Sequence, residues 1–286
     1  MERRIRTDLA SEERDILRAG SGDAGELPGV RASDEMRGSF RVTTVDILDS
    51  EGENALCKPI GRYVTVELDA LLRRAEDSFE QAAQLIAEIL RGILRPDMGG
   101  STLIAGLGNS AITPDAVGPL SVDSVMATRH LKTHLPEVFA AFRSVCAVET
   151  GVLGTTGIES AEMLRSLCAA VSPTRVIAVD ALASAELTKL CRTVQISDAG
   201  IVPGSGVGND REALSEQTLG APVVAIGVPT VVDAANFSDD EAAKGMFVTP
   251  RDIDTAVRDV AKLIGYGIDL AMHDGLTVAD IDLFLS

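Results

Sequence analysis

Two aspartates follow apolar segments at positions where a carboxylate can do chemistry. Asp115 lies in the loop GLGNSAITPDAVGP, and Asp180 ends the apolar run VIAVD. A carboxylate at the end of a buried strand is costly unless it is paired, hydrogen-bonded or used in a reaction. Two carboxylates that lie close together have different pKa values, so one can act as a base and the other as an acid on a water molecule. The spacing permits this pair, although Asp115, just before a predicted helix, is also a candidate N-cap.

Two glycine-rich loops follow other apolar runs and are candidates for holding a substrate. They are ETGVLGTTGIES (149–160) and ISDAGIVPGSGVGN (196–209). Backbone N–H groups of such loops can hold a substrate carbonyl or a peptide, while the competing interpretation is a tight turn that needs glycine. The candidate substrate-binding residues in these loops are Gly154, Thr155, Thr156, Asp198, Gly204, Ser205 and Gly206.

Other common kinds of site find little support. The loop that begins G-L-G-N lacks the third glycine of a dinucleotide-binding motif, and no acidic residue closes a second strand at the required distance. His130 and His134 have a metal-ligand spacing, yet RHLKTH lacks the glutamate of H-E-x-x-H. The chain contains no G-x-S-x-G motif, and none of its cysteines stands in a recognisable nucleophile context. We therefore predict neither a metal site nor a cofactor.

The composition restricts the class of protein and its partners. The chain has 286 residues, of which 45% are hydrophobic, as in an ordinary globular protein. Its 43 acidic and 26 basic residues give a net charge of −17, which repels the phosphate backbone, so we predict no direct nucleic-acid binding. The start MERRIRTD lacks the apolar core of a signal peptide, and no apolar run has the length of a membrane span. Four widely spaced cysteines favour a reducing compartment, so we predict a cytoplasmic protein that does not bind membranes.

The elements that must position these residues alternate between apolar runs and helical patterns. This alternation predicts an α/β fold with three layers, in which a mostly parallel twisted sheet is covered by helices on both faces. The apolar runs are 101–108, 144–150, 175–182, 194–197 and 222–228. An additional N-terminal β-rich portion covers 40–48 and 62–68, and long helices are predicted over 69–94 and 252–273. Residues 1–35 are polar and predict a loosely attached segment. In such folds ligands gather at the carboxyl ends of the strands.

Several motifs, in this order along the chain, resemble the bacterial spore germination protease family. They are TDLASE, GLGNSAITPDAVGP, ETGVLGTTGIE, VDALAS, QISDAGIVPGSGVGN and IGVPTVVDA. The resemblance runs from about Thr7 to His273. More distantly, the GLGN and PDAVG motifs followed by VDA are similar to hydrogenase maturation endopeptidases, which implies a fold like theirs.

The resemblance implies an activity and two catalytic residues. Members of the family degrade small acid-soluble spore proteins during germination, in the cytoplasm of the spore core, and they assemble as homotetramers. By resemblance, Asp115 and Asp180 are the catalytic pair. The substrates are cut after an acidic residue in a Thr-Glu-(Phe/Ile)-Ala-Ser-Glu type sequence. A substrate acid calls for a cationic neighbour, for which Arg192 and Arg211 are candidates.

The stretch TDLASE at the N-terminus is a near copy of that substrate motif. Since the family is made as a zymogen that processes itself, the resemblance implies self-cleavage between Asp8 and Leu9. Residues 1–8 are then a propeptide, and 9–286 form a single α/β peptidase domain. The competing interpretation is that Ser11 and Glu12, or Thr7 with Glu12, cap the first helix.

Two alternative functions remain open at this level. One is a metal-dependent maturation endopeptidase of the hydrogenase-protease type, whose activity a chelator would abolish. The other is a non-catalytic protein that binds a peptide or a nucleotide, which any observed cleavage would exclude.

Overall fold

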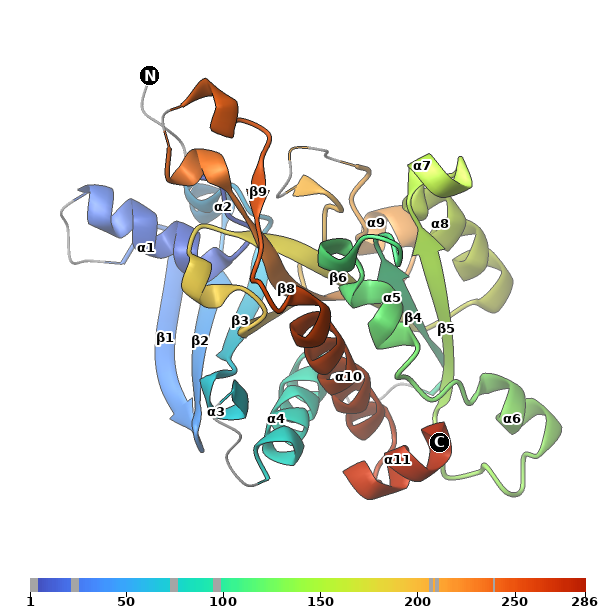
Figure 1. Ribbon diagram of the computed structural model, residues 1–286. Helices are drawn as coiled ribbons and strands as arrows, with labels where there is room; N and C mark the ends of the chain where they lie inside the picture. The colour runs from blue at the N-terminus through green and yellow to red at the C-terminus, as the bar shows by residue number, and fades with distance from the viewer. Residues whose placement is uncertain are drawn as a thin grey trace.

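The computed structural model describes residues 5–21, 26–72, 77–94, 99–205, 208, 211–238 and 240–286. Its centre is a 9-stranded sheet in the order β1-β2-β3-β7-β8-β6-β4-β5, with β9 paired to β8 (Figure 1). The strands are β1 (Val30–Arg37), β2 (Phe40–Ile47), β3 (Gly61–Glu67), β4 (Ser101–Leu107), β5 (Ser144–Gly151), β6 (Arg175–Ser184), β7 (Thr193–Ser197), β8 (Val223–Asp233) and β9 (Phe247–Val248). The predicted α/β fold with an N-terminal β-rich portion is confirmed.

Four strands form the parallel part of the sheet. β4 pairs in parallel with β5 on one side and with β6 on the other, and β6 pairs in parallel with β8. The chain therefore leaves β4 toward one edge and returns on its other side, which makes the boundary between β4 and β6 a topological switch point. Ligand sites of open α/β sheets form at such points, outside the carboxyl ends of the strands.

The remaining strands are antiparallel. β1, β2 and β3 form a meander, and β3 joins the rest of the sheet through β7, which is antiparallel to both β3 and β8. The run 194–197 was expected among the parallel strands, and this expectation is wrong for β7. An apolar run reports burial on both faces and carries no information about strand direction. β1 was not predicted at all, because most of its side chains are exposed and polar.

Helices cover both faces of the sheet, so the predicted three layers are confirmed (Figure 1). One face packs against α4 (Ser78–Ile93), α5 (Val117–Val122) and α10 (Ile253–Met272). The other packs against α1 (Ala10–Ser21), α2 (Ser50–Leu56), α8 (Ser160–Val171) and α9 (Glu216–Leu219). The other helices are α3 (Asp69–Leu72), α6 (Arg129–His134), α7 (Leu153–Thr156), α11 (Val278–Leu285) and the short 3-10 turns η1 (Thr113–Asp115), η2 (Leu187–Lys189), η4 (Ala234–Asn236) and η5 (Glu241–Ala243). In the described part of the chain, no helix is long and apolar enough to cross a membrane.

The N-terminal segment is firmly packed, contrary to the expectation of a loosely attached one. Leu9 and Ala10 are 0% exposed, and α1 lies against the outer part of the sheet. Buried polar residues here form specific bonds: Arg14, for example, forms an ion pair with Glu26 at 2.8 Å between Nη2 and Oε1. The prediction of a loosely attached segment was wrong because it rested on polar composition alone. Polar side chains can be buried when hydrogen bonds and ion pairs compensate the loss of water.

A buried aspartate on α10 gives the fold a measurable pH dependence. Asp269 is 0% exposed, and both its carboxylate oxygens accept the Met126 N–H at 3.1 Å. Burial raises its pKa to about 8, against about 4 in an unfolded chain. The carboxyl is protonated in both states at low pH, and between these two values only the unfolded state loses its proton. The free energy of unfolding therefore falls as pH rises from about 4 to about 8.

We expect Asp269→Asn to flatten this pH dependence, because the amide can accept the Met126 N–H and cannot ionise. Urea midpoints of the wild type and the variant, measured across the same pH range, check it. The difference between the two proteins should shift in favour of the variant as pH rises. Two curves that stay parallel would contradict the assigned protonation.

Candidate active site

Asp180 lies on β6 and Asp115 in the turn after the neighbouring strand β4, at the switch point of the sheet. Asp115 ends this turn, η1. The Thr230 hydroxyl of β8 donates to the Pro114 carbonyl at 2.7 Å and fixes η1 over the sheet. The two aspartates interact electrostatically, with Asp115 raising the pKa of Asp180. The two predicted carboxylates thus lie at the same edge of the sheet, within electrostatic range of each other.

The loop before Asp115 turns back sharply on β4. Gly108 has a φ of +105°, and a Cβ there would lie 2.1 Å from the Asp115 carbonyl oxygen. Only glycine permits this approach. Asp115 is half-buried, and its Oδ2 accepts the Asn109 N–H at 2.8 Å. Burial raises the pKa of Asp115, and the Asn109 N–H opposes that rise.

Asp180 occupies the drier environment of the two. It is 5% exposed, and its Oδ1 accepts the Ala181 N–H at 2.9 Å. Burial raises its pKa well above the ordinary value, and the charges of Asp115 and Asp8 add to the rise. Of the pair, Asp180 is therefore the carboxyl whose ionisation is opposed more strongly, and the more exposed Asp115 ionises more readily.

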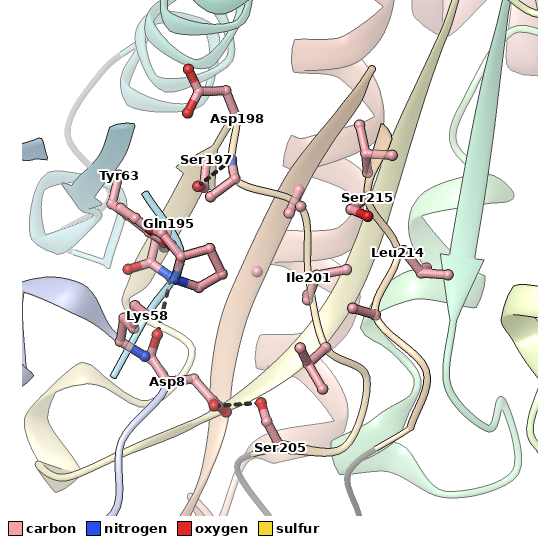
Figure 2. Close-up of a pocket in the computed structure, with 18 of the residues that line it drawn as sticks. Asp8, Lys58, Tyr63, Gln195, Ser197, Asp198, Ile201, Ser205, Leu214 and Ser215 are labelled. Carbon is pink, nitrogen blue, oxygen red and sulfur yellow. Dashed lines mark hydrogen bonds between the residues drawn. The ribbon is translucent and has the colours of Figure 1, made fainter. Parts of the chain in front are cut away.

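The N-terminal residues Thr7–Glu12, here called the docked segment, lie against the end of β6, with Asp8 within electrostatic range of Asp180. The Asp8 N–H donates to the Ala183 carbonyl at 2.9 Å, and the Ala183 N–H donates back to Asp8 Oδ2 at 2.8 Å. The other carboxylate oxygen, Oδ1, accepts the Ser205 hydroxyl at 2.8 Å (Figure 2). An acidic side chain is thus held by one hydroxyl and one backbone N–H.

The backbone around the Asp8–Leu9 peptide bond is held by one side chain of β7. Gln195 Nε2 donates to the Asp8 carbonyl oxygen at 3.2 Å (Figure 2). The same amide accepts the Ala10 N–H through Oε1 at 2.8 Å. Gln195 thus contacts the chain on both sides of this peptide bond.

The far end of the docked segment is anchored by Glu12. Its Oε1 accepts the Ser184 hydroxyl at 2.6 Å, and its Oε2 accepts the Ala185 N–H at 2.7 Å. Thr7 accepts the Leu9 N–H at 3.0 Å and donates to Glu12. Glu12 therefore bonds to the end of β6. In a capping box, its side chain would instead accept the backbone N–H at the start of its own helix.

A cavity of about 1210 Å³ adjoins the docked segment and is lined by Lys58, Gln195, Asp198 and Ser205 among others. Lys58 is half-buried and donates to the Thr7 carbonyl at 3.5 Å. Burial lowers its pKa, while Asp8, Glu13 and Glu12 oppose that change. A cation therefore faces the acidic docked segment from the cavity wall.

The candidate substrate-binding residues are distributed unequally. Ser205 contacts Asp8, and Gly204, with a φ of +77°, forms the turn that presents it. Asp198 lines the cavity and accepts the Arg62 N–H at 2.7 Å, and Figure 2 shows it well away from Asp8. Gly206 lies outside the described residues.

Gly154, Thr155 and Thr156 form the exposed helix α7 after the edge strand β5. The hydroxyl of Thr155 donates to the Val152 carbonyl at 2.9 Å, within the same turn. Among the described residues, the hydrogen bonds of the docked segment do not reach this loop. In this chain, α7 and the docked segment lie at different parts of the sheet.

The predicted arginines have other neighbours than Asp8. Arg211 forms an ion pair with Glu159 at 3.2 Å, and Arg192 lines a separate cavity beside Cys191. The expected arginine beside the acidic residue is therefore not what holds Asp8. Its carboxylate is bound by the Ser205 hydroxyl and the Ala183 N–H, and Lys58 donates to the neighbouring Thr7 carbonyl. His130 and His134 are exposed on α6. No group of three or more potential metal ligands is present within the ranges that the structure describes.

Two contact residues were missed at the sequence level, Gln195 and Ser184. Gln195 stands in the buried run TVQIS, and a polar amide in the middle of an apolar strand is the signal that was available. Ser184 ends β6 and carried no such signal. Its role depends on where the N-terminal segment docks.

An α/β sheet with two aspartates at its switch point and a peptide segment docked beside them defines a peptidase class of site. The chain belongs to the germination protease family, whose model matches residues 7–243. It is therefore an endopeptidase, and the non-catalytic alternative is wrong.

Several germination proteases are similar to this chain over most of its length. The one from Clostridium tetani is 38% identical over 323 aligned positions, covering 99% of each chain. The one from Bacillus velezensis is 43% identical over 241 positions, covering 82% of this chain and 65% of the relative. A solved structure, the NiFe hydrogenase maturation protease HycI from Thermococcus kodakarensis, is 20% identical with a TM-score of 0.38, covering 63% of this chain and 98% of HycI.

Proposed function

We propose that this endopeptidase cleaves small acid-soluble spore proteins after an acidic residue in Thr-Glu-(Phe/Ile)-Ala-Ser-Glu type sequences. The observation that carries the proposal is the position of the docked segment, whose sequence Thr-Asp-Leu-Ala-Ser-Glu is of that type. Its acid, Asp8, is bound by Ser205 and Ala183 and raises the pKa of Asp180. A substrate of the same sequence type fits the same contacts.

The two aspartates divide the chemistry according to their environments. Asp115, the more exposed, takes a proton from a water molecule, whose oxygen attacks the carbonyl carbon of the acidic residue. Asp180, the more buried, holds a proton and delivers it to the leaving nitrogen as the peptide bond breaks. The products are a new carboxyl group and a new amino terminus.

The same chemistry applied to the docked segment is self-processing. The bond that would break is Asp8–Leu9, which would release the propeptide 1–8 and leave 9–286 as the peptidase domain. Leu9 and Ala10 are buried in contacts that a substrate of the same sequence type would use, so the new terminus is expected to leave them before a second molecule is cut. A zymogen in the spore core and a homotetrameric assembly complete the proposal and rest on the family.

The contacts of Glu12 predict a second specificity position, four residues beyond the cut. We expect a Thr-Glu-Ile-Ala-Ser-Gln peptide to lose about 10- to 100-fold in kcat/KM relative to Thr-Glu-Ile-Ala-Ser-Glu, because hydrogen bonds to a charged group contribute about 1.5–3 kcal/mol. An aspartate at the last position, which keeps the charge with a shorter reach, should give an intermediate value. Steady-state rates of the processed enzyme on the three peptides check this. Equal kcat/KM values would show that the Ser184 and Ala185 contacts play no part in substrate recognition.

Cleavage of the Thr-Glu-Ile-Ala-Ser-Glu peptide tests the proposed function as a whole. The masses of the products should place the cut between Glu and Ile, and a chelator should leave the rate unchanged. A cut elsewhere, or no cut, would refute the proposed specificity. Activity that a chelator abolishes and a transition metal restores would favour the metal-dependent alternative instead.

A further inference from the structure

One rung of the sheet connects Gln195 with Asp180. Gln195 of β7 pairs with Gly227 of β8, and Gly227 pairs with Asp180 of β6. Side chains on one rung point to the same face, and adjacent strands are about 4.8 Å apart, so the two Cα atoms lie about 10 Å apart. The residue between them has no side chain, and a Cβ there would lie 2.3 Å from Leu182 Cδ1. The amide and the carboxyl therefore lie on the same face of the sheet, on either side of Gly227, and the Leu182 side chain covers Gly227.

The docked segment is bonded both to β6 and to the Gln195 side chain of β7, on either side of the Asp8–Leu9 bond. Asp8 is bound to β6 through Ala183, while its carbonyl oxygen accepts Gln195 Nε2 on the β7 side at 3.2 Å (Figure 2). Lys58 also donates to the segment, but it does so at the Thr7 carbonyl, one residue upstream. Among the described residues, Gln195 is thus the side chain whose hydrogen bond reaches the carbonyl of the bond to be cut.

The orientation of the Gln195 amide is fixed by its second contact. Oε1 accepts the Ala10 N–H at 2.8 Å, which leaves Nε2 facing the Asp8 carbonyl. A flipped amide would place oxygen against oxygen and N–H against N–H, so the network excludes it. Gln195 is 7% exposed, which strengthens a hydrogen bond to developing charge.

We propose that Gln195 is a further catalytic residue, whose Nε2–H stabilises the oxyanion formed when water attacks the carbonyl carbon. This inference rests on the proposed cleavage at Asp8–Leu9. As the new carbon–oxygen bond forms, the carbonyl π electrons move onto the oxygen, and the hydrogen bond from Nε2 shortens and strengthens. When the carbon–nitrogen bond breaks, those electrons re-form the carbonyl. Gln195 transfers no proton in either step.

The test is the first-order rate of self-cleavage in the full chain, because this rate contains no step for binding a second molecule. Gln195→Glu keeps an acceptor for the Ala10 N–H and, at neutral pH, removes the donor. Gln195→Met removes both with little change in volume. We expect both variants to process about 10²- to 10³-fold more slowly than the wild type, the usual loss when an oxyanion donor is removed.

Hydrogen exchange of residues 9–14, measured by mass spectrometry, separates catalysis from docking. For Gln195→Glu, protection of this stretch should stay near that of the wild type while the rate falls. The matched control is Thr193→Val on the same strand and face, whose buried hydroxyl makes no hydrogen bond within the described residues; it should process at the wild-type rate.

Three outcomes would overturn the inference. Wild-type processing by Gln195→Glu would show that the donor is not needed. Loss of rate and of protection in parallel would make Gln195 a structural residue only. A wild type that is not cut at Asp8–Leu9 would refute the proposed function and this inference with it, whereas normal cutting by the wild type and by both Gln195 variants refutes the inference alone.

Discussion

Replacing Asp180 by asparagine is expected to slow self-cleavage by about 10²- to 10⁴-fold, the usual contribution of a positioned acid or base. The amide has nearly the shape of the acid, but it has no proton to give to the leaving nitrogen. Asp115→Asn should show a loss of the same size, since it removes the base. Intact mass followed over time measures both rates.

The matched control for these variants is Asp269→Asn. It makes the same substitution at another buried aspartate with a raised pKa, on the helix α10, which packs against a different core cluster from α1. We expect it to process like the wild type. Because Asp180 must hold its proton, the wild-type rate should also fall as pH rises through the raised pKa of that residue. Normal processing by Asp115→Asn and Asp180→Asn would refute the assignment of the pair.

Replacing Asp8 by asparagine is expected to lower the rate of self-cleavage by on the order of 10²-fold. The carboxylate accepts two hydrogen bonds, from Ser205 and Ala183, and bonds to a charged group contribute about 1.5–3 kcal/mol each. The charge of Asp8 also helps to raise the pKa of Asp180, so the substrate itself favours the protonated acid. The amide has no charge and only one acceptor oxygen, so it loses the electrostatic effect and at least one of the two hydrogen bonds.

Two further variants show which contact matters. Asp8→Glu keeps the charge and should retain most of the rate. Ser205→Ala removes one of the two donors and should give about a 10-fold loss. Rates from intact mass over time measure all three variants. If Asp8→Asn were processed as fast as the wild type, recognition would have to rest on the backbone and on Glu12 instead of on the acid.

The fold was predictable where burial dictates sequence. The strands β4, β6 and β8 are buried on both faces, so their runs of Val, Ile, Leu and Ala were visible in the sequence. The direction of β7 was not predictable, because TVQIS has the same pattern in either direction. α1 was interpreted as loosely attached because its composition is polar, and the partners that allow Glu12 to be buried, such as Ser184, come from a distant part of the chain.

The two aspartates of the site were predictable because buried strands leave visible apolar runs, and the residues that follow such runs lie at the edge of the sheet. The position of Asp115 and Asp180 after apolar runs implied the carboxyl edge of the sheet, and the topology then makes those two runs adjacent strands, β4 and β6. The contacts of Gln195 and Ser184 depend on strand register and on the path of the N-terminus. These are tertiary properties that one sequence does not encode locally. The α7 loop was predicted to bind substrate from its glycines and threonines. Its threonine hydroxyls instead donate to carbonyls of their own turn, those of Val152 and Ile158.

The central claim is that each chain carries a substrate in its own active site, with the Asp8–Leu9 bond placed for cleavage. The most direct test is the intact mass of the wild-type protein over time, at two widely different protein concentrations. The account predicts loss of residues 1–8 alone, at a first-order rate that does not depend on concentration. A cut at another bond would contradict the position of the docked segment. A rate that rises in proportion to concentration would show that the segment is cut by another copy of the chain.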